Sequence, residues 1–150
     1  MDSHTLRSPE ETWAWGKQLT RILRVGDVIA LVGELGSGKT TLVQGLAAGW
    51  GCRRRAMSPT FALVNEYRSP RGAFFHMDMY RLTPRELEAF PLEEYLDQRA
   101  LCVIEWADRV RERLPADTLE IDLEGIESPR RSLRIVHPSK FWQKRFQALS

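Results

Sequence analysis

The stretch that decides the fold is Ile29-Ala30-Leu31-Val32-Gly33-Glu34-Leu35-Gly36-Ser37-Gly38-Lys39-Thr40. Its residues 33–40 match the pattern G-x-x-x-x-G-K-[ST] at every fixed position. Four apolar residues precede the pattern, and residues 41–48 after it have a helical composition. A buried strand, a glycine turn and a helix start are the context in which this pattern binds phosphate. The stretch therefore predicts a nucleoside triphosphate site, whereas a glycine loop before an ordinary helix leaves the lysine and the threonine unexplained.

Each residue type in this pattern has a physical role. Glycines let successive backbone N–H groups point at one anion, and the helix start adds further donors and the positive end of its dipole. Lys39 would reach the β- and γ-phosphates, and the Thr40 hydroxyl would hold Mg²⁺. This pattern favours binding of ATP, since the guanine motif N-K-x-D is absent from the sequence.

Hydrolysis or transfer requires a carboxylate near the metal. The apolar run 101–104 ends in Glu105, and strand ends meet at the ligand crevice of an open α/β sheet, so Glu105 is expected beside the phosphate loop. It could hold the metal shell or orient the attacking water. Asp108 is the rival acid, but it is predicted to lie within a charged helix.

Three further candidates come from the middle of the chain. Asp78 ends a predicted hairpin strand and is either a second metal-side acid or a turn residue. His76, in the same strand, is expected to be half-exposed. Thr60 follows Pro59 between the loop helix and the next strand, where a mobile threonine can sense the γ-phosphate.

Composition narrows the class of protein. The chain has 150 residues, 43% hydrophobic and 28% charged, which fits one globular domain, 1–150. No apolar run approaches the roughly 20 residues that span a bilayer, and the first residues do not resemble a signal peptide, so we expect a cytoplasmic protein without membrane contact. Cys52 and Cys102 are expected to be free thiols.

The segment 138–150 is predicted to be a basic tail or helix. Residues 128–150 contain no acid, and Trp142, Phe146 and Leu149 are spaced as one face of a helix. Packing onto the domain is the favoured explanation, with a surface for a partner as the alternative. A solvated surface is the favoured explanation for the basic residues, with contact to RNA or to an acidic partner as the alternative.

The order of elements predicts the fold class. A strand–loop–helix unit is followed by predicted hairpins at 61–77 and 118–136 and by the buried strand at 101–104. This order indicates an α/β, three-layer P-loop NTPase domain with a mixed, mainly parallel central sheet.

Four segments together resemble the TsaE family, the small ATPases of bacterial tRNA threonylcarbamoyladenosine synthesis. The resemblance covers about residues 6–138, and the segments that carry it are 33–41, Ser58-Pro59-Thr60-Phe61, His76-Met77-Asp78-Met79-Tyr80-Arg81-Leu82 and Val103-Ile104-Glu105-Trp106-Ala107. It implies that Gly33, Glu34, Leu35, Gly36, Ser37, Gly38, Lys39, Thr40, Thr41 and Trp106 contact the nucleotide. It also implies that Thr40, Asp78 and Glu105 serve the metal and that Thr60 is the switch threonine.

The resemblance also implies a function. A member of this family would bind ATP and Mg²⁺, hydrolyse ATP slowly or with partners, and act with the TsaB and TsaD proteins to reset or load the complex that modifies tRNA beside the anticodon. Contact with tRNA would come through that complex. Two other hypotheses remain open from the residues: a small-molecule or nucleoside kinase on the same scaffold, and a binding module without turnover.

Overall fold

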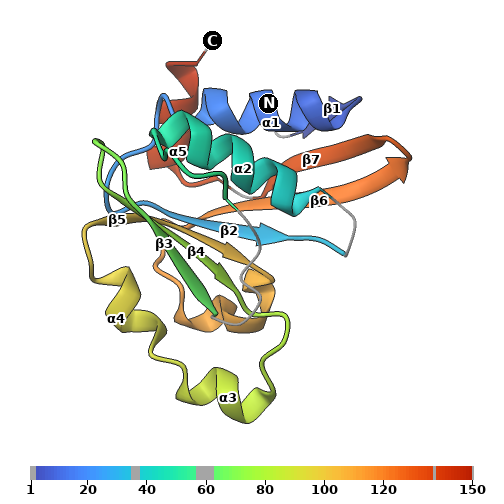
Figure 1. Cartoon of the computed structure of the whole chain (residues 1–150). Coiled ribbons are helices and arrows are strands. Elements are labelled where there is room, and N and C mark those ends of the chain that lie inside the picture. The colour runs from blue at the N-terminus through green and yellow to red at the C-terminus, as the bar shows by residue number, and fades with distance from the viewer. Residues whose placement is uncertain (1–2, 35–37, 57–62, 137, 150) are drawn as a thin grey trace.

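The computed structural model of the protein describes residues 3–34, 38–56, 63–136 and 138–149 (Figure 1). Its strands are β1 (Ser3–Leu6), β2 (Val28–Val32), β3 (Val64–Tyr67), β4 (Ala73–Asp78), β5 (Ala100–Glu105), β6 (Leu119–Glu127) and β7 (Arg130–Val136). Its helices are α1 (Pro9–Leu19), α2 (Lys39–Trp50), α3 (Pro84–Ala89), α4 (Leu92–Leu96), the 3₁₀-helix η1 (Ala107–Arg113) and α5 (Lys140–Gln147).

The strands form one mixed sheet with the order β1-β7-β6-β2-β5-β4-β3. The four central strands β6, β2, β5 and β4 run parallel, while β3 and β7 pair antiparallel with their neighbours. The strand that leads into the glycine-rich segment therefore lies in the middle of the parallel region. This confirms the predicted mixed, mainly parallel sheet.

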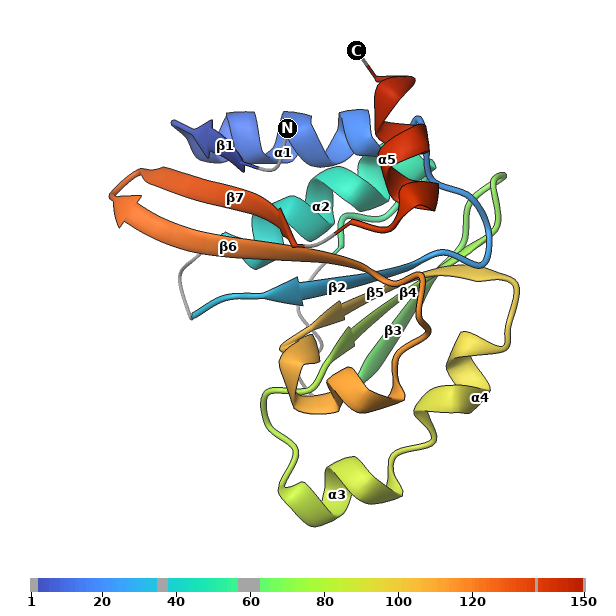
Figure 2. The same ribbon diagram turned by 180° about the vertical axis from the view of Figure 1, so that it is seen from behind.

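Helices cover both faces of the sheet, which makes three layers. Helices α1, α2 and α5 lie on one face, and α3, α4 and η1 lie toward the other (Figures 1 and 2). Alternate residues of β2 divide between the two cores, because Ile29 and Leu31 belong to the first and Val28 and Ala30 to the second. A strand buried on both faces must be apolar throughout, which is why this segment is one continuous hydrophobic run.

Close packing of α1 against α2 fixes the helix that starts at the phosphate loop. A Cβ atom on Gly45 would overlap the backbone carbonyl of Trp13, so only glycine permits this approach. At the start of α1, the Ser8 hydroxyl accepts a hydrogen bond from the Glu11 N–H at 3.2 Å, as the predicted helix cap requires.

Three local predictions differ from the structure. Strand β1 was not predicted, since residues 3–6 show no apolar alternation. Helix α1 ends at Leu19 and not near residue 25 as predicted. Residues 21–23 form tight turns in which each backbone N–H donates to the carbonyl three residues earlier. These turns keep Ile22 and Leu23 in the core. The charged helix predicted after Glu105 is a 3₁₀-helix interrupted at Val110.

The C-terminal helix packs onto the domain, as favoured from its sequence. Trp142 is 1% exposed, and its indole N–H donates to the Asp117 carbonyl at 2.6 Å. Both cysteines are free, and burial raises the pKa of the Cys102 thiol to about 12. Within the described ranges, no helix has both the length and the apolar character needed to cross a membrane.

Candidate functional site

The described part of the phosphate loop has the expected backbone geometry. Gly38 stands at the N-cap of α2 with φ 99°, a left-handed conformation that favours glycine. The first turn of α2 is fully described and contains Lys39, Thr40 and Thr41 but no acid. The first turn of the helix therefore carries no carboxylate of its own that would repel an anion. The predicted contacts Leu35, Gly36 and Ser37 lie outside the described residues.

The Lys39 ammonium is held at the centre of the site. Lys39 is 4% exposed, and its Nζ donates to the carbonyls of Gly33 at 2.5 Å and Glu34 at 2.8 Å. Burial lowers the pKa of Lys39, and the nearby carboxylates Glu105, Asp78, Asp108 and Glu34 oppose that shift. A buried cation surrounded by acids and carbonyls is well placed to exchange those contacts for phosphate oxygens.

The two predicted metal-side acids end neighbouring strands. Asp78 and Glu105 are register partners in the parallel pair β4–β5, and Leu31 of β2 is the partner of Glu105 on the other side. The Asp78 carboxylate accepts from the Tyr80 N–H at 2.9 Å, and burial raises the pKa of Asp78. Both acids therefore lie at the strand edge where the phosphate loop begins.

The Glu105 side chain is engaged by a buried histidine. His76 Nε2 lies 2.5 Å from Glu105 Oε2, and the two side chains are 0% and 4% exposed. Because a carboxylate accepts hydrogen bonds, Nε2 is the ring nitrogen that carries the proton. Nδ1 is buried without a hydrogen-bond partner among the described residues. The expectation of a half-exposed His76 was wrong, since β4 is buried on both faces.

One aromatic ring covers the lysine, and a second ring packs against the first. Trp106 has φ 57°, rare for a residue other than glycine, and its ring lies 4.5 Å from Lys39 Nζ. The Tyr80 ring packs against Trp106 in a tilted arrangement, with centroids 4.7 Å apart and 35° between the ring planes. Arg109 donates to the carbonyls of Met79 and Tyr80 at 2.6 and 2.9 Å, which joins this segment to η1. A strained backbone of this kind is common at binding sites.

The other candidates have different outcomes. Thr40 and Thr41 are half-buried at the start of α2, and Asp108 is exposed on η1. Thr60 lies outside the described residues, so its switch role stays a prediction. In the part of the chain that the structure describes, no three His, Cys, Asp or Glu side chains form a ready-made metal cluster. A metal here would need oxygen atoms of the nucleotide as well, which is the usual arrangement for Mg²⁺.

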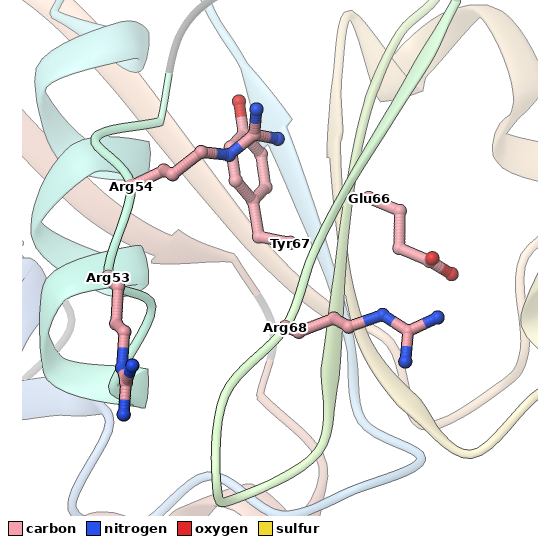
Figure 3. A pocket seen from close by; sticks show the side chains of 5 residues that line it. All are labelled: Arg53, Arg54, Glu66, Tyr67 and Arg68. Carbon is pink, nitrogen blue, oxygen red and sulfur yellow. The ribbon is translucent and has the colours of Figure 1, made fainter.

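A pocket lies at the opposite end of the β3–β4 hairpin, far along the strands from Asp78. Its volume is about 380 Å³, and it is lined by Arg53, Arg54, Glu66, Tyr67 and Arg68 (Figure 3). Arg54 lies over the Tyr67 ring at 5.2 Å, whereas Arg53 points away from it and Glu66 and Arg68 extend on the other side of the chain. These side chains do not converge on one point, unlike those around Lys39.

The central strand, the left-handed glycine and the buried lysine at a helix start define an α/β protein of the phosphate-loop class. Comparison with known proteins gives the family. The model of "Threonylcarbamoyl adenosine biosynthesis protein TsaE" matches residues 6–133, and this chain belongs to the TsaE family.

Individual relatives agree with this assignment. The chain is 41% identical over 114 residues to the tRNA threonylcarbamoyladenosine biosynthesis protein TsaE of Bacillus subtilis, which covers 76% of this chain and 72% of that protein. It is 38% identical to the protein of the same name from Treponema pallidum, over 86% of this chain and 96% of that one. The crystal structure of YdiB from Bacillus superimposes with a TM-score of 0.81 at 30% identity, covering 98% of this chain and 92% of that chain.

Proposed function

We propose that this protein binds ATP with Mg²⁺, hydrolyses it slowly, and serves the threonylcarbamoyladenosine modification of tRNA beside the anticodon. The observation that carries the proposal is the meeting of Lys39, Asp78 and Glu105 at one strand edge in a chain of the TsaE family. The names of the relatives place them in that biosynthesis. We extend that process to this chain.

One set of residues would bind the phosphates and another would bind the metal. Lys39 and the N–H groups of the loop would hold the β- and γ-phosphates, and Thr41 and Trp106 would complete the contacts to the nucleotide. Thr40, Asp78 and Glu105 are oxygen donors of the kind that Mg²⁺ takes, and they lie at the end of the loop where the phosphates would be. Bound Mg²⁺ would supply neutralisation of phosphate charge. Thr60 is proposed as the sensor of the γ-phosphate.

A slow basal rate follows from the contact between His76 and Glu105. A carboxylate that is 4% exposed and bonded to a buried ring is poorly placed to orient a water molecule. Hydrolysis would then wait for a rearrangement that turns Glu105 toward the phosphates. We propose that the TsaB and TsaD proteins favour this rearrangement. The cycle of ATP binding and hydrolysis would then reset or load their complex, and this protein would contact tRNA only through that complex. The cytoplasm is the proposed location, and 1–150 the proposed single domain.

The kinase alternative is weakened by the engagement of its arginines. A kinase usually needs arginines on a mobile lid, and the arginines in this chain that could be assigned to one are Arg81, Arg85, Arg109, Arg111 and Arg113. Arg113 donates to the carbonyls of Leu87 and Phe90 and pairs with Glu93, and Arg111 pairs with Glu120. With Arg109 bound to two carbonyls, three of the five hold the fold together.

One assay separates the hypotheses. Phosphate release from ATP is measured for the protein alone, with TsaB and TsaD, and with a panel of nucleosides. We expect slow release that rises when both partners are present. Loss of ATP that depends on a nucleoside, without free phosphate, would instead support a kinase. Binding of ATP with no turnover in any mixture would leave a binding module.

A further inference from the structure

A groove lies between the turns at residues 21–24 and the C-terminal helix α5. Its volume is about 410 Å³, and it is lined by residues 21–24, by Phe141, Lys144 and Arg145 of α5 and by Ala148 at the end of that helix. Residues 21–24 lie before the start of β2, whereas the glycine-rich segment follows its end (Figures 1 and 2). A molecule in this groove would therefore not cover the proposed nucleotide site.

Arg145 brings an unused hydrogen-bond donor to the groove. Its side chain is 10% exposed, and its Nη1 donates to the Ile22 carbonyl at 3.0 Å and to the Asp27 carboxylate at 2.5 Å. Its Nε is buried and has no hydrogen-bond partner among the described residues. Nε and Nη2 form one edge of the planar guanidinium, and such an edge can donate two parallel bonds to a carboxylate. Since buried donors in native proteins are nearly always bonded, this edge is suited to the oxygen atoms of a ligand.

The rim of the groove is positively charged. Arg21, Arg24 and Lys144 are exposed, and in the part of the chain that the structure describes none of their side chains forms an ion pair. Residues 128–150 contain no acid, so α5 itself offers no counter-charge. The rim therefore complements an acidic partner.

The interior of the groove distinguishes a peptide from RNA. Ile22 and Leu23 are buried and give the groove an aliphatic floor. RNA-binding grooves use exposed aromatic ring faces as platforms on which bases stack. Here the Arg145 guanidinium lies over the Phe141 ring at 4.2 Å, and Trp142 is buried. An aliphatic floor with its aromatic rings already occupied favours a peptide side chain over a base.

We infer that this groove binds an acidic segment of a partner protein, with an apolar side chain on the floor and a carboxylate on the Nε edge of Arg145. Further acidic residues of the segment meet the three cations of the rim. The α5 wall lies beyond residues 6–133, which the family model matches, so this site belongs to the chain and not to the family pattern. The inference does not depend on the proposed nucleotide site.

The test starts from a peptide library displayed on phage and selected on the full chain. We expect enrichment of sequences in which aspartate or glutamate flanks leucine, isoleucine or valine. A fluorescent peptide of the enriched sequence is then titrated against wild type and variants, with anisotropy as the measurement. The double variant Arg21→Glu/Lys144→Glu should bind it about tenfold more weakly or worse, because two attractive charges become repulsive.

The matched control is Arg7→Glu/Arg85→Glu, which makes the same change in net charge at exposed residues outside the groove. It should bind the peptide as wild type does. Arg145→Lys keeps a cation for Asp27 and removes the Nε edge, so it should also weaken binding. Thermal melting shows that each variant is folded, and the rim variant decides alone if Arg145→Lys is not.

Several results would overturn the inference. They are a selection without enrichment, enrichment of sequences that lack acids, and equal affinity of the rim variant and wild type. A single-stranded oligouridylate is titrated in parallel, and tighter binding of it than of the peptide, lost in the rim variant, would assign the groove to RNA instead. The rim variant should bind ATP as wild type does, so failure here leaves the proposed function standing.

Discussion

Two largely buried side-chain pairs in this protein have the same N–O distance but different surroundings. His76 and Glu105 meet at 2.5 Å at the strand edge beside Lys39, and Arg145 and Asp27 meet at 2.5 Å where α5 packs before β2. Arg145 also donates to the Ile22 carbonyl and lies over the rings of Phe141 and Trp142. Burial of charge alone therefore does not mark a functional site.

The two pairs differ in whether their carboxylate lies where a ligand could bind. The Asp27 carboxylate accepts from Arg145 and from the Arg24 N–H at 2.6 Å, so its partners all belong to the fold. Glu105 ends its strand next to Asp78 and Lys39, where a ligand would bring new charge. We therefore expect the Arg145–Asp27 pair to govern stability and the His76–Glu105 pair to govern turnover, and the following variants test that division.

The largest effect is expected from Glu105→Gln. Glutamine keeps the size and can still bond His76, but it cannot act as a base or carry negative charge. Phosphate release with TsaB and TsaD present should fall about 10²- to 10⁴-fold, the usual contribution of such a group, while ATP affinity and the melting temperature change little. Full turnover in this variant would transfer the role to Asp78, with Asp78→Asn as the next variant to assay.

Asp27→Ala should have the opposite profile. It leaves the Arg145 guanidinium buried without its counter-ion, which costs about 3–5 kcal/mol of unfolding free energy. Denaturant titration measures the loss, and ATP affinity at a temperature where the variant is folded should equal that of wild type. A stable Asp27→Ala variant with impaired nucleotide binding would reverse the assignment of the two pairs.

Lys39→Ala tests the cation between the two acids. Removing a charge-assisted contact to phosphate should weaken ATP binding by about 1.5–3 kcal/mol, roughly ten- to a hundredfold. Displacement of a fluorescent nucleotide analogue provides the measurement. Lys17→Ala, on α1 and away from the strand edge, is the matched control and should bind as wild type does.

The smallest effect is expected at a solvent-exposed pair. Arg130 and Glu127 are 49% and 78% exposed, and surface pairs contribute at most about 1 kcal/mol. The free energy of unfolding of Glu127→Gln, measured by denaturant titration, should therefore lie within about 1 kcal/mol of the wild-type value. A loss of unfolding free energy as large as that expected for Asp27→Ala would mean that the β6–β7 hairpin depends on the Arg130–Glu127 pair.

Sequence alone could predict the parts of the site that are local in the chain. The apolar run, the glycines and Lys39 follow one another, so strand, turn and helix start could be read from adjacent residues. Glu105 could be placed because an acid that ends a buried strand in an open α/β sheet lies at the ligand edge. The β3–β4 hairpin and the helix cap at Ser8 were predicted for the same local reason.

The missed features depend on contacts between distant residues. The partner of His76 is 29 positions away and that of Asp27 is 118 positions away, so neither pair has a sequence signature. The apolar neighbours of His76 on both sides of β4 were the available signal for its burial. The groove between residues 21–24 and α5 also joins segments that lie far apart in the chain, so no local pattern could show it.

The central claim is that the segment from Gly33 to Thr41 binds a nucleoside triphosphate and that Lys39 contacts its phosphates. Titration calorimetry of the wild-type protein with ATP and Mg²⁺ tests it most directly. The account predicts heat that saturates at one nucleotide per chain and an affinity that falls when Mg²⁺ is removed. A flat titration with folded protein would contradict it.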